Sequence, residues 1–197
     1  MSSFRQRTPI DRNAEPPADD EPQGWTEDAD PESVARKILL DQLSIKARSR
    51  HELEDRLARR NVPEEVAGRL LDRFEEVGLV DDEAFARSWV EGRQRSRGLA
   101  RTALAVELRR KGIDDETART VLAEVDPGDE DAAAAQLVRK KLRSMRGLDP
   151  QVATRRLVGM LARKGYAPGT AYAVVRRELG ALADPDAADA PDLGLDD

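Results

Sequence analysis

The sequence of 197 residues contains no cysteine, one histidine and few aromatic residues (two Trp, two Tyr and three Phe). Without cysteine, the chain can form no disulfide bond, thiolate metal site or thiol redox centre. The single histidine, His51, excludes most zinc, haem and catalytic-triad chemistry. An enzyme built from this sequence would have to work with carboxylates, lysines and arginines.

Long hydrophobic runs are also missing. No apolar segment approaches the roughly 18 residues that a membrane-spanning helix needs. The first residues, MSSFRQRTPIDRN, lack the apolar stretch of a secretory signal. We therefore expect a soluble, cytoplasmic protein that makes no contact with a membrane.

Charge is distributed unevenly along the chain, whose formal net charge is −6. Residues 1–32 carry three Arg and nine Asp or Glu, and residues 183–197 carry six Asp and no basic residue. The 150 residues between them have a net charge of +6, and the excess lies in 129–182, with 11 basic and five acidic residues. We expect any surface that faces a polyanion to lie in this last third.

The two acidic ends resemble unfolded chain. Five prolines fall within residues 9–31, and the last residues read ADPDAADAPDLGLDD. Such segments bury too little apolar surface to offset the conformational entropy lost on folding. We expect residues 1–32 and 183–197 to be disordered acidic tails, with shielding of the basic body as an alternative role.

Apolar residues between the tails recur at three- and four-residue spacing, which predicts an all-α fold. Val66, Leu70, Phe74 and Val77 form one such stripe, and similar stripes recur in 118–125 and 171–182. No segment alternates with the two-residue period of a strand. With capping residues and glycines as boundaries, the pattern predicts nine helices near 31–45, 49–60, 63–77, 82–96, 99–111, 114–125, 129–145, 149–164 and 168–182.

The nine predicted helices form three copies of one unit. Segments 53–71, 104–122 and 157–175 share two leucines four residues apart, a basic residue, Gly or Asn, an apolar residue, an Ala and an aliphatic residue. The matched positions are Leu53/Leu104/Leu157, Leu57/Leu108/Leu161, Arg60/Lys111/Lys164, Asn61/Gly112/Gly165, Val62/Ile113/Tyr166, Ala67/Ala118/Ala171 and Leu71/Leu122/Val175. Agreement at so many positions indicates an internal repeat.

Each shared residue type has a physical role in a helical hairpin. The leucines direct one face of a helix into the core, and Gly or Asn accepts the left-handed conformation that ends the helix. A unit of about 50 residues buries little surface alone, so neighbouring units should stack. We predict an elongated, curved array of three three-helix repeats, in residues 33–80, 81–128 and 129–182.

The carboxylates do not suggest a catalytic site, because most lie at predicted helix starts, where they complement the helix dipole. The phosphate-binding and nucleophile motifs G-x-x-x-x-G-K-[ST], G-x-G-x-x-G and G-x-S-x-G are absent. We predict that the protein is not an enzyme and uses no metal ion or cofactor.

Basic residues are better candidates for function. Arg139, Arg143 and Arg146 fall on one face of a predicted helix, Arg156 and Arg163 share a face of the next, and more arginines surround the helix junction near residue 98. Such faces suit phosphates or an acidic protein groove, although they are also compatible with an ordinary solvated surface. The interaction candidates are Arg93, Arg97, Arg101, Arg139, Lys140, Arg143, Arg146, Arg155, Arg156, Arg163 and Lys164.

The manner of nucleic-acid binding is restricted by composition. Aromatic residues are not interleaved with the basic ones, so single strands would not be held by base stacking. Candidate recognition helices carry acidic residues at their starts, which disfavours sequence-specific reading of DNA. Any DNA would be bound through its phosphates, single- or double-stranded, with strong salt dependence.

Residues 78–122, GLVDDEAFARSWVEGRQRSRGLARTALAVELRRKGIDDETARTVL, resemble the central repeat of the RecX family. The resemblance is carried by Asp81-Asp82, Phe85-Ala86-Arg87, Trp89, Arg93, Gly98, Glu107-Leu108 and Lys111-Gly112-Ile113. It extends over about residues 33–182, and Asn61 replaces the glycine more usual in the first turn. We expect Phe85 and Trp89 to be core anchors.

This resemblance implies regulation without catalysis. RecX-like proteins consist of tandem three-helix repeats, bind the RecA recombinase, lie along the groove of its DNA filament and suppress its ATPase, strand-exchange and coprotease activities. It implies a role in DNA repair, recombination and the SOS response, and it favours a monomer. Two alternatives stay open: a phosphate-contacting DNA-binding protein independent of RecA, and a helical scaffold for acidic protein partners.

Overall fold

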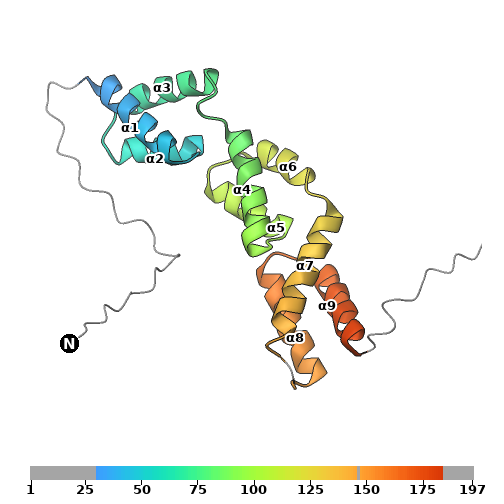
Figure 1. Cartoon of the computed structure of the whole chain (residues 1–197). Coiled ribbons are helices and arrows are strands. Elements are labelled where there is room, and N and C mark those ends of the chain that lie inside the picture. Colours follow the sequence, from blue (N-terminus) through green and yellow to red (C-terminus); the bar gives the residue numbers. More distant parts are fainter. Residues whose placement is uncertain (1–29, 146, 184–197) are drawn as a thin grey trace, which may run out of the picture. The chain divides into compact units, whose positions relative to one another are not determined.

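The computed structural model describes residues 30–145 and 147–183, in which all regular structure is helical (Figure 1). The helices of these ranges are α1 (Pro31–Ile45), α2 (Arg50–Ala58), α3 (Glu64–Glu76), α4 (Asp82–Arg97), α5 (Arg101–Arg110), α6 (Asp115–Ala123), α7 (Pro127–Leu142), α8 (Pro150–Arg163) and α9 (Pro168–Ala183). The predicted all-α fold of nine helices is confirmed. None of these helices is long and apolar enough to cross a lipid bilayer.

The predicted disordered tails lie outside the described residues, except for their inner ends. α1 begins at Pro31 and α9 ends at Ala183, so these few inner residues are helical. The elongated, curved form of the array and the limits of its repeats stay predictions.

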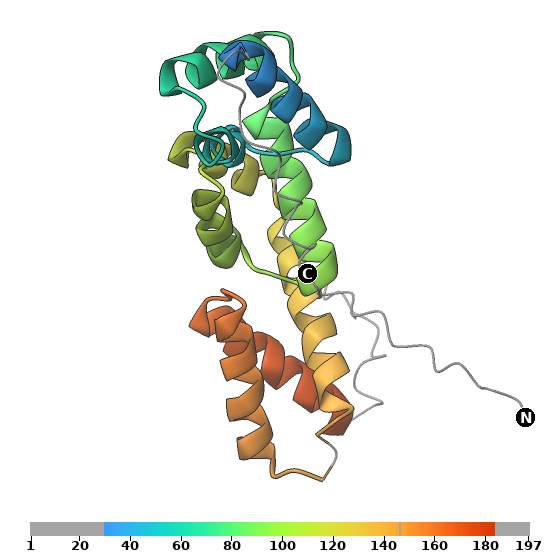
Figure 2. The same cartoon turned by 90° about the vertical axis from the view of Figure 1, so that its left-hand side faces the viewer.

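The helices pack in consecutive groups of three: α1 to α3, α4 to α6 and α7 to α9 (Figures 1 and 2). A separate apolar core lies within each group. The six matched leucines of α2, α5 and α8 have no exposed surface, as the repeat alignment predicts. We call these three groups the first, second and third repeats.

The second helix of every repeat ends in the same way. Asn61, Gly112 and Gly165 have positive φ angles of 56°, 76° and 89°. The amide of the next residue (Val62, Ile113 or Tyr166) donates to the carbonyl of the second matched leucine at 3.1, 3.1 and 3.2 Å. This is the hydrogen bond of a Schellman helix end. The predicted left-handed turn is therefore present in all three repeats.

Successive repeats are joined by one recurring contact, which we call the joint. In each joint, a hydrogen bond runs from one repeat to the next. The donor is the residue that precedes the second helix of one repeat, and the acceptor is the carbonyl of the lysine that ends the second helix of the following repeat. Ser49 Oγ donates to the Lys111 oxygen at 2.6 Å, and the Ala100 amide donates to the Lys164 oxygen at 2.9 Å. The joint thus links the start of one helix to the end of another.

An arginine and a carboxylate form the second part of each joint. The Arg50 amide donates to Asp82 Oδ1 at 2.8 Å, and Arg101 Nε donates to Glu130 Oε2 at 2.8 Å. Each arginine is the first residue of its helix, and each carboxylate lies in the first turn of the next repeat's first helix. Burial in this joint raises the pKa of Asp82. Glu130 thus compensates the guanidinium of Arg101, which stands at the unfavourable end of the helix dipole, whereas Asp82 accepts a backbone amide at the start of α2.

Glycine is required in the turns of the second and third repeats because the preceding repeat approaches closely. A Cβ added at Gly112 would lie 2.2 Å from His51 Cβ, and one at Gly165 would lie 2.6 Å from the Ala103 amide nitrogen. Asn61 occupies the same turn of the first repeat, which no repeat precedes among the described residues. Asn tolerates the left-handed conformation, so the departure from Gly at this position is explained.

Replacing Gly112 tests the joint, and Gly78 provides a matched control. Gly78 has a similar φ of 71°, but no described atom lies within 4 Å of an added Cβ. Gly78→Ala should cost about 1–2 kcal/mol of backbone strain. Gly112→Ala should cost about 1–3 kcal/mol more, because it also overpacks the joint. Urea unfolding followed by circular dichroism measures both, and equal losses would contradict the joint.

Tyr166 provides a second test, in the joint between the second and third repeats. Its side chain is 3% exposed, and its hydroxyl donates to the Gly98 carbonyl at 3.1 Å. Burial raises its pKa to about 12, and the charges of Glu130 and Asp131 act in the same direction. The hydroxyl is therefore held in its neutral form in the folded protein.

The free energy of unfolding should consequently fall as pH rises from about 10, where an unfolded tyrosine ionises, to about 12. The loss is at most about 3 kcal/mol, and the stabilisation is fully present below pH 10 or so. Tyr166→Phe should lack this component. The near-ultraviolet absorbance of tyrosinate should also lose a titration near pH 12 in this variant. An unchanged alkaline profile in Tyr166→Phe would refute the assignment.

Candidate functional site: the basic surface of the third repeat

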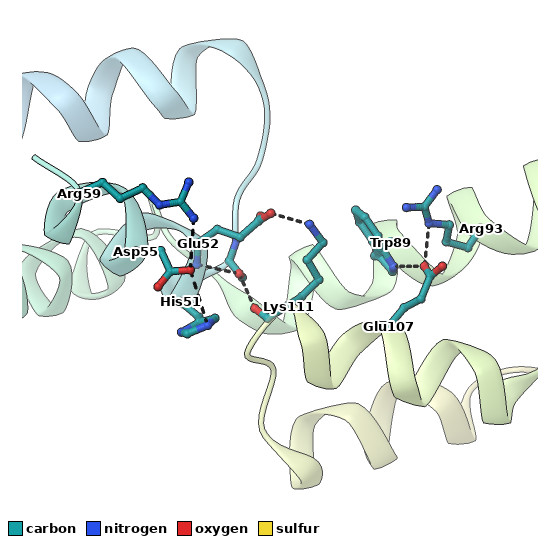
Figure 3. Close-up of polar contacts among 9 residues, drawn as sticks. His51, Glu52, Asp55, Arg59, Trp89, Arg93, Glu107 and Lys111 are labelled. Carbon is teal, nitrogen blue, oxygen red and sulfur yellow. Dashed lines mark hydrogen bonds and ion pairs between the residues drawn. The ribbon is translucent and has the colours of Figure 1, made fainter. Parts of the chain in front are cut away.

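The candidate arginines of the second repeat are engaged within the protein. Arg93 Nε donates to Glu107 Oε2 at 2.7 Å, and the guanidinium lies 4.2 Å from the centre of the Trp89 ring (Figure 3). Arg97 Nη1 lies 3.9 Å from Glu107 Oε1. Arg101 pairs with Glu130 in the joint. These three residues stabilise the second repeat and its junctions, which reduces their capacity to bind a partner.

Trp89 lies at the centre of this polar cluster. Its indole Nε1 donates to Glu107 Oε2 at 2.9 Å, and Lys111 Nζ lies 4.6 Å from the ring centre (Figure 3). Lys111 also contacts Glu52 Oε1 of the first repeat at 2.5 Å. A cation near the face of a Trp ring is attracted by the ring quadrupole. The cluster therefore reinforces the joint between the first and second repeats.

Other residues of the family-like motif also have structural roles. Asp81 caps α4 by accepting the Ala84 amide, and Phe85 and Ala86 are buried in the core of the second repeat. Phe85 stacks on Trp89 with ring centres 5.7 Å apart. The expectation that Phe85 anchors the core is confirmed, and Trp89 packs against that core while partly exposed.

In the third repeat, Arg139 joins two helices. Its Nε and Nη2 atoms donate to the carboxylate of Glu178 in α9 at 2.5 and 3.1 Å. Glu178 is 5% exposed, and its hydrogen bonds raise the pKa of Arg139. Because this guanidinium neutralises a buried carboxylate, Arg139 is a structural residue that still exposes part of its surface.

Four basic side chains of α7 and α8 surround a hollow of about 350 Å³, which we call the basic hollow. The hollow is lined by Lys141, Arg155, Arg156 and Arg163, together with Met145, Gly159 and Met160. All four basic residues are exposed, and none of their side chains has a carboxylate partner among the described residues. This surface therefore carries four positive charges over a partly apolar floor.

The acidic residues of the third repeat are mostly engaged elsewhere. Asp131 pairs with Arg177, Glu178 pairs with Arg139, and Glu130 pairs with Arg101. Asp149 caps α8 by accepting the amides of its first turn. The net positive charge of this repeat is thus left on its surface, as the charge distribution along the sequence predicts.

The remaining candidates lie in three settings. Lys140 and Arg143 are exposed near the end of α7, whereas Arg146 lies outside the described residues. The Lys164 ammonium donates to the Arg97 carbonyl, and its pKa is lowered by burial and by the charge of Arg97. Lys164 therefore belongs to the joint. The structure brings Arg155, Arg156 and Arg163 together around the hollow. For Arg156 and Arg163, this agrees with the shared helix face predicted from their spacing.

Sequence analysis missed Lys141, the fourth cation of the basic hollow. Lys141 lies in the last turn of α7 and Met145 lies just after the end of that helix, and both line the hollow. Helical spacing favours the series Arg139, Arg143 and Arg146, to which Lys141 does not belong. Only the packing of α7 and α8 places Lys141 beside the cations of α8.

The arrangement favours binding of an anion rather than chemistry. No group of three or more His, Asp or Glu in the described ranges is placed to hold a metal ion. Exposed Leu148 precedes α8, and exposed Val152 lies in its first turn, one turn before Arg155 and Arg156. Apolar surface next to cations suits a protein partner as well as phosphates.

Comparison with family models identifies each repeat separately. The model for the first three-helix domain of RecX matches residues 35–74, the second-domain model matches 81–122, and the third-domain model matches 129–175. The matches therefore follow the order of the three repeats along the chain.

Curated relatives agree with these models. The chain is 51% identical to the regulatory protein RecX of Thermobifida fusca (strain YX) over 147 residues, which cover 75% of this chain and 80% of that protein. It is 50% identical to the regulatory protein RecX of Streptomyces lividans over 150 residues, covering 76% and 80%. The RecX relative from Mycolicibacterium smegmatis is 51% identical over 153 residues, covering 75% and 81%.

The fold also matches solved structures. The crystal structure of RecX from Lactobacillus salivarius aligns with a TM-score of 0.70 at 20% identity, covering 75% of this chain and 96% of that one. A second RecX crystal structure aligns with a TM-score of 0.68 at 24% identity, covering 76% and 73%. RecX proteins are regulatory proteins rather than enzymes. The three domain matches and the identity to curated relatives show that this chain belongs to the RecX family.

Proposed function

We propose that this RecX-family protein binds the RecA recombinase on its DNA filament and inhibits it, with the basic hollow as a principal contact. The observation that supports this proposal is a group of four exposed cations that have no carboxylate partner among the described residues: Lys141, Arg155, Arg156 and Arg163. A recombinase filament offers both acidic side chains and DNA phosphates. Either kind of anion complements the hollow.

The rest of the protein supports this choice of surface. Several basic residues of the first and second repeats pair with carboxylates, including Arg50 with Asp72 and Glu75, and Arg87 with Glu124. Such pairs leave little net charge for a partner. The hollow instead combines apolar lining with arginines that pair with no carboxylate of the described ranges. Arginines are favoured in protein interfaces because they bind carboxylates in a bidentate manner.

The finer activities rest on the family. We propose that binding lowers the ATPase, strand-exchange and coprotease activities of RecA, and that the protein acts as a cytoplasmic monomer in DNA repair and recombination. A second candidate function is binding of DNA through its phosphates without RecA, which the exposed cations of the hollow also favour. This alternative predicts affinity for DNA alone that falls steeply with salt concentration.

Reversing the charge of the hollow tests the proposal. The triple variant Arg155→Glu, Arg156→Glu and Arg163→Glu should inhibit RecA ATPase on single-stranded DNA at least 10-fold less potently than the parent, since each charged contact contributes on the order of 1 kcal/mol. The matched control is Arg59→Glu, Arg69→Glu and Arg73→Glu in the first repeat. Their side chains are 73%, 60% and 67% exposed, and the charge change is the same. The control should stay within about 3-fold of the parent.

The assay is run with the regulator below one molecule per RecA monomer, and thermal unfolding confirms that both variants are folded. If the hollow variant inhibits as strongly as the parent, the hollow is not the contact. If both variants keep inhibition but DNA binding without RecA is lost only in the hollow variant, the alternative function is favoured.

A further inference from the structure

The C-terminal segment 184–197 is negatively charged, whereas the basic hollow is lined by four cations. The segment contains six Asp and no basic residue, and it follows α9 directly in the repeat that carries the hollow. We propose that this segment binds the basic hollow within the same chain and competes there with the protein's partner. Its effect on inhibition rests on the proposed function, whereas the intramolecular contact does not.

The length of the segment is sufficient for this contact. Fourteen residues follow Ala183, and 14 extended residues reach about 46 Å. α8 and α9 contain 14 and 16 residues and are therefore about 21 and 24 Å long. Because α9 packs against both α7 and α8, the hollow lies within roughly 35 Å of the end of α9. The segment can reach the hollow without any change in the helices.

The chemistry of the segment complements the lining of the hollow. Aspartates can accept paired hydrogen bonds from Arg155, Arg156 and Arg163, and a carboxylate can accept from the Lys141 ammonium. Leu193 and Leu195, which lie between Asp192 and Asp196, can contact Met145 and Met160 in the lining of the hollow. The described part of the third repeat supplies no carboxylate for these four cations.

Covalent attachment makes weak contacts sufficient. A segment joined through a short flexible link has an effective concentration on the order of millimolar at a site that it can reach. Surface ion pairs are individually weak and are screened by salt, so the bound segment can be displaced by a stronger anionic partner. The contact thus acts as a competitor that raises the concentration of protein needed for half-maximal inhibition.

The N-terminal segment fits the hollow less well. Residues 1–30, which precede α1 of the first repeat, contain three Arg as well as eight acidic residues. The C-terminal segment is uniformly acidic and is attached to the third repeat itself. Deletion of residues 1–29 is therefore a suitable control for deletion of 184–197.

Zero-length carbodiimide coupling of the full chain tests the contact without any partner. The reagent joins lysine ammonium groups to carboxylates in direct contact, and mass spectrometry maps the products. Lys141 should couple to aspartates of 184–197 several-fold more often than Lys37 or Lys46 of the first repeat, and the product should disappear at high salt. The variant Lys141→Arg should lose this product, since arginine does not couple. Equal coupling to Lys37, Lys46 and Lys141, or none at Lys141, would overturn the proposal.

Deletion of 184–197 tests the competition. It should lower the concentration for half-maximal inhibition of RecA ATPase about 3–10-fold at low salt, whereas deletion of 1–29 should change it less than 2-fold or so. Coupling at Lys141 without any gain in potency would reject competition. Inhibition by the parent without coupling at Lys141 would reject the contact and leave the proposed function standing, so the two failures can be distinguished.

Discussion

The joint between successive repeats restricts the backbone and the residue types at the place where one repeat packs on the next. A hydrogen bond from the residue preceding one helix must reach the carbonyl of Lys111 or Lys164 at the end of another, and this approach leaves no room for a Cβ at the following glycine. The Lys-Gly pairs of the second and third repeats therefore serve mainly to form the joints. Their recurrence in the sequence reflects the packing of one repeat on the next.

The ends of the array differ in the way that this constraint requires. The first repeat carries Asn61, whose side chain needs no space for a preceding repeat. α8 begins seven residues before Leu157, whereas α2 and α5 begin three residues before Leu53 and Leu104. The extra turn of α8 extends the helix at the end that forms the joint in the first two repeats. This turn also carries the exposed Val152 beside the basic hollow.

Much of the fold could be predicted from the sequence because its signals are local. Helical spacing, the capping box of Ser49 and Glu52, and the left-handed turns are all set by neighbouring residues. The pairing of charges could not be predicted, because Arg139 and Glu178 lie 39 residues apart and Arg101 and Glu130 lie 29 apart. Sequence spacing predicts the helix face of a basic residue. Only tertiary packing determines which basic residues pair with a carboxylate of the described ranges and which do not.

We propose that the third repeat presents the basic hollow to a RecA filament. Electron cryomicroscopy of the full-length protein bound to RecA on single-stranded DNA would show which repeat contacts the filament. We expect α8 to face the filament, with Arg155, Arg156 and Arg163 next to acidic side chains or phosphates. A reconstruction in which the filament contacts only the first or second repeat and α8 faces solvent would contradict it.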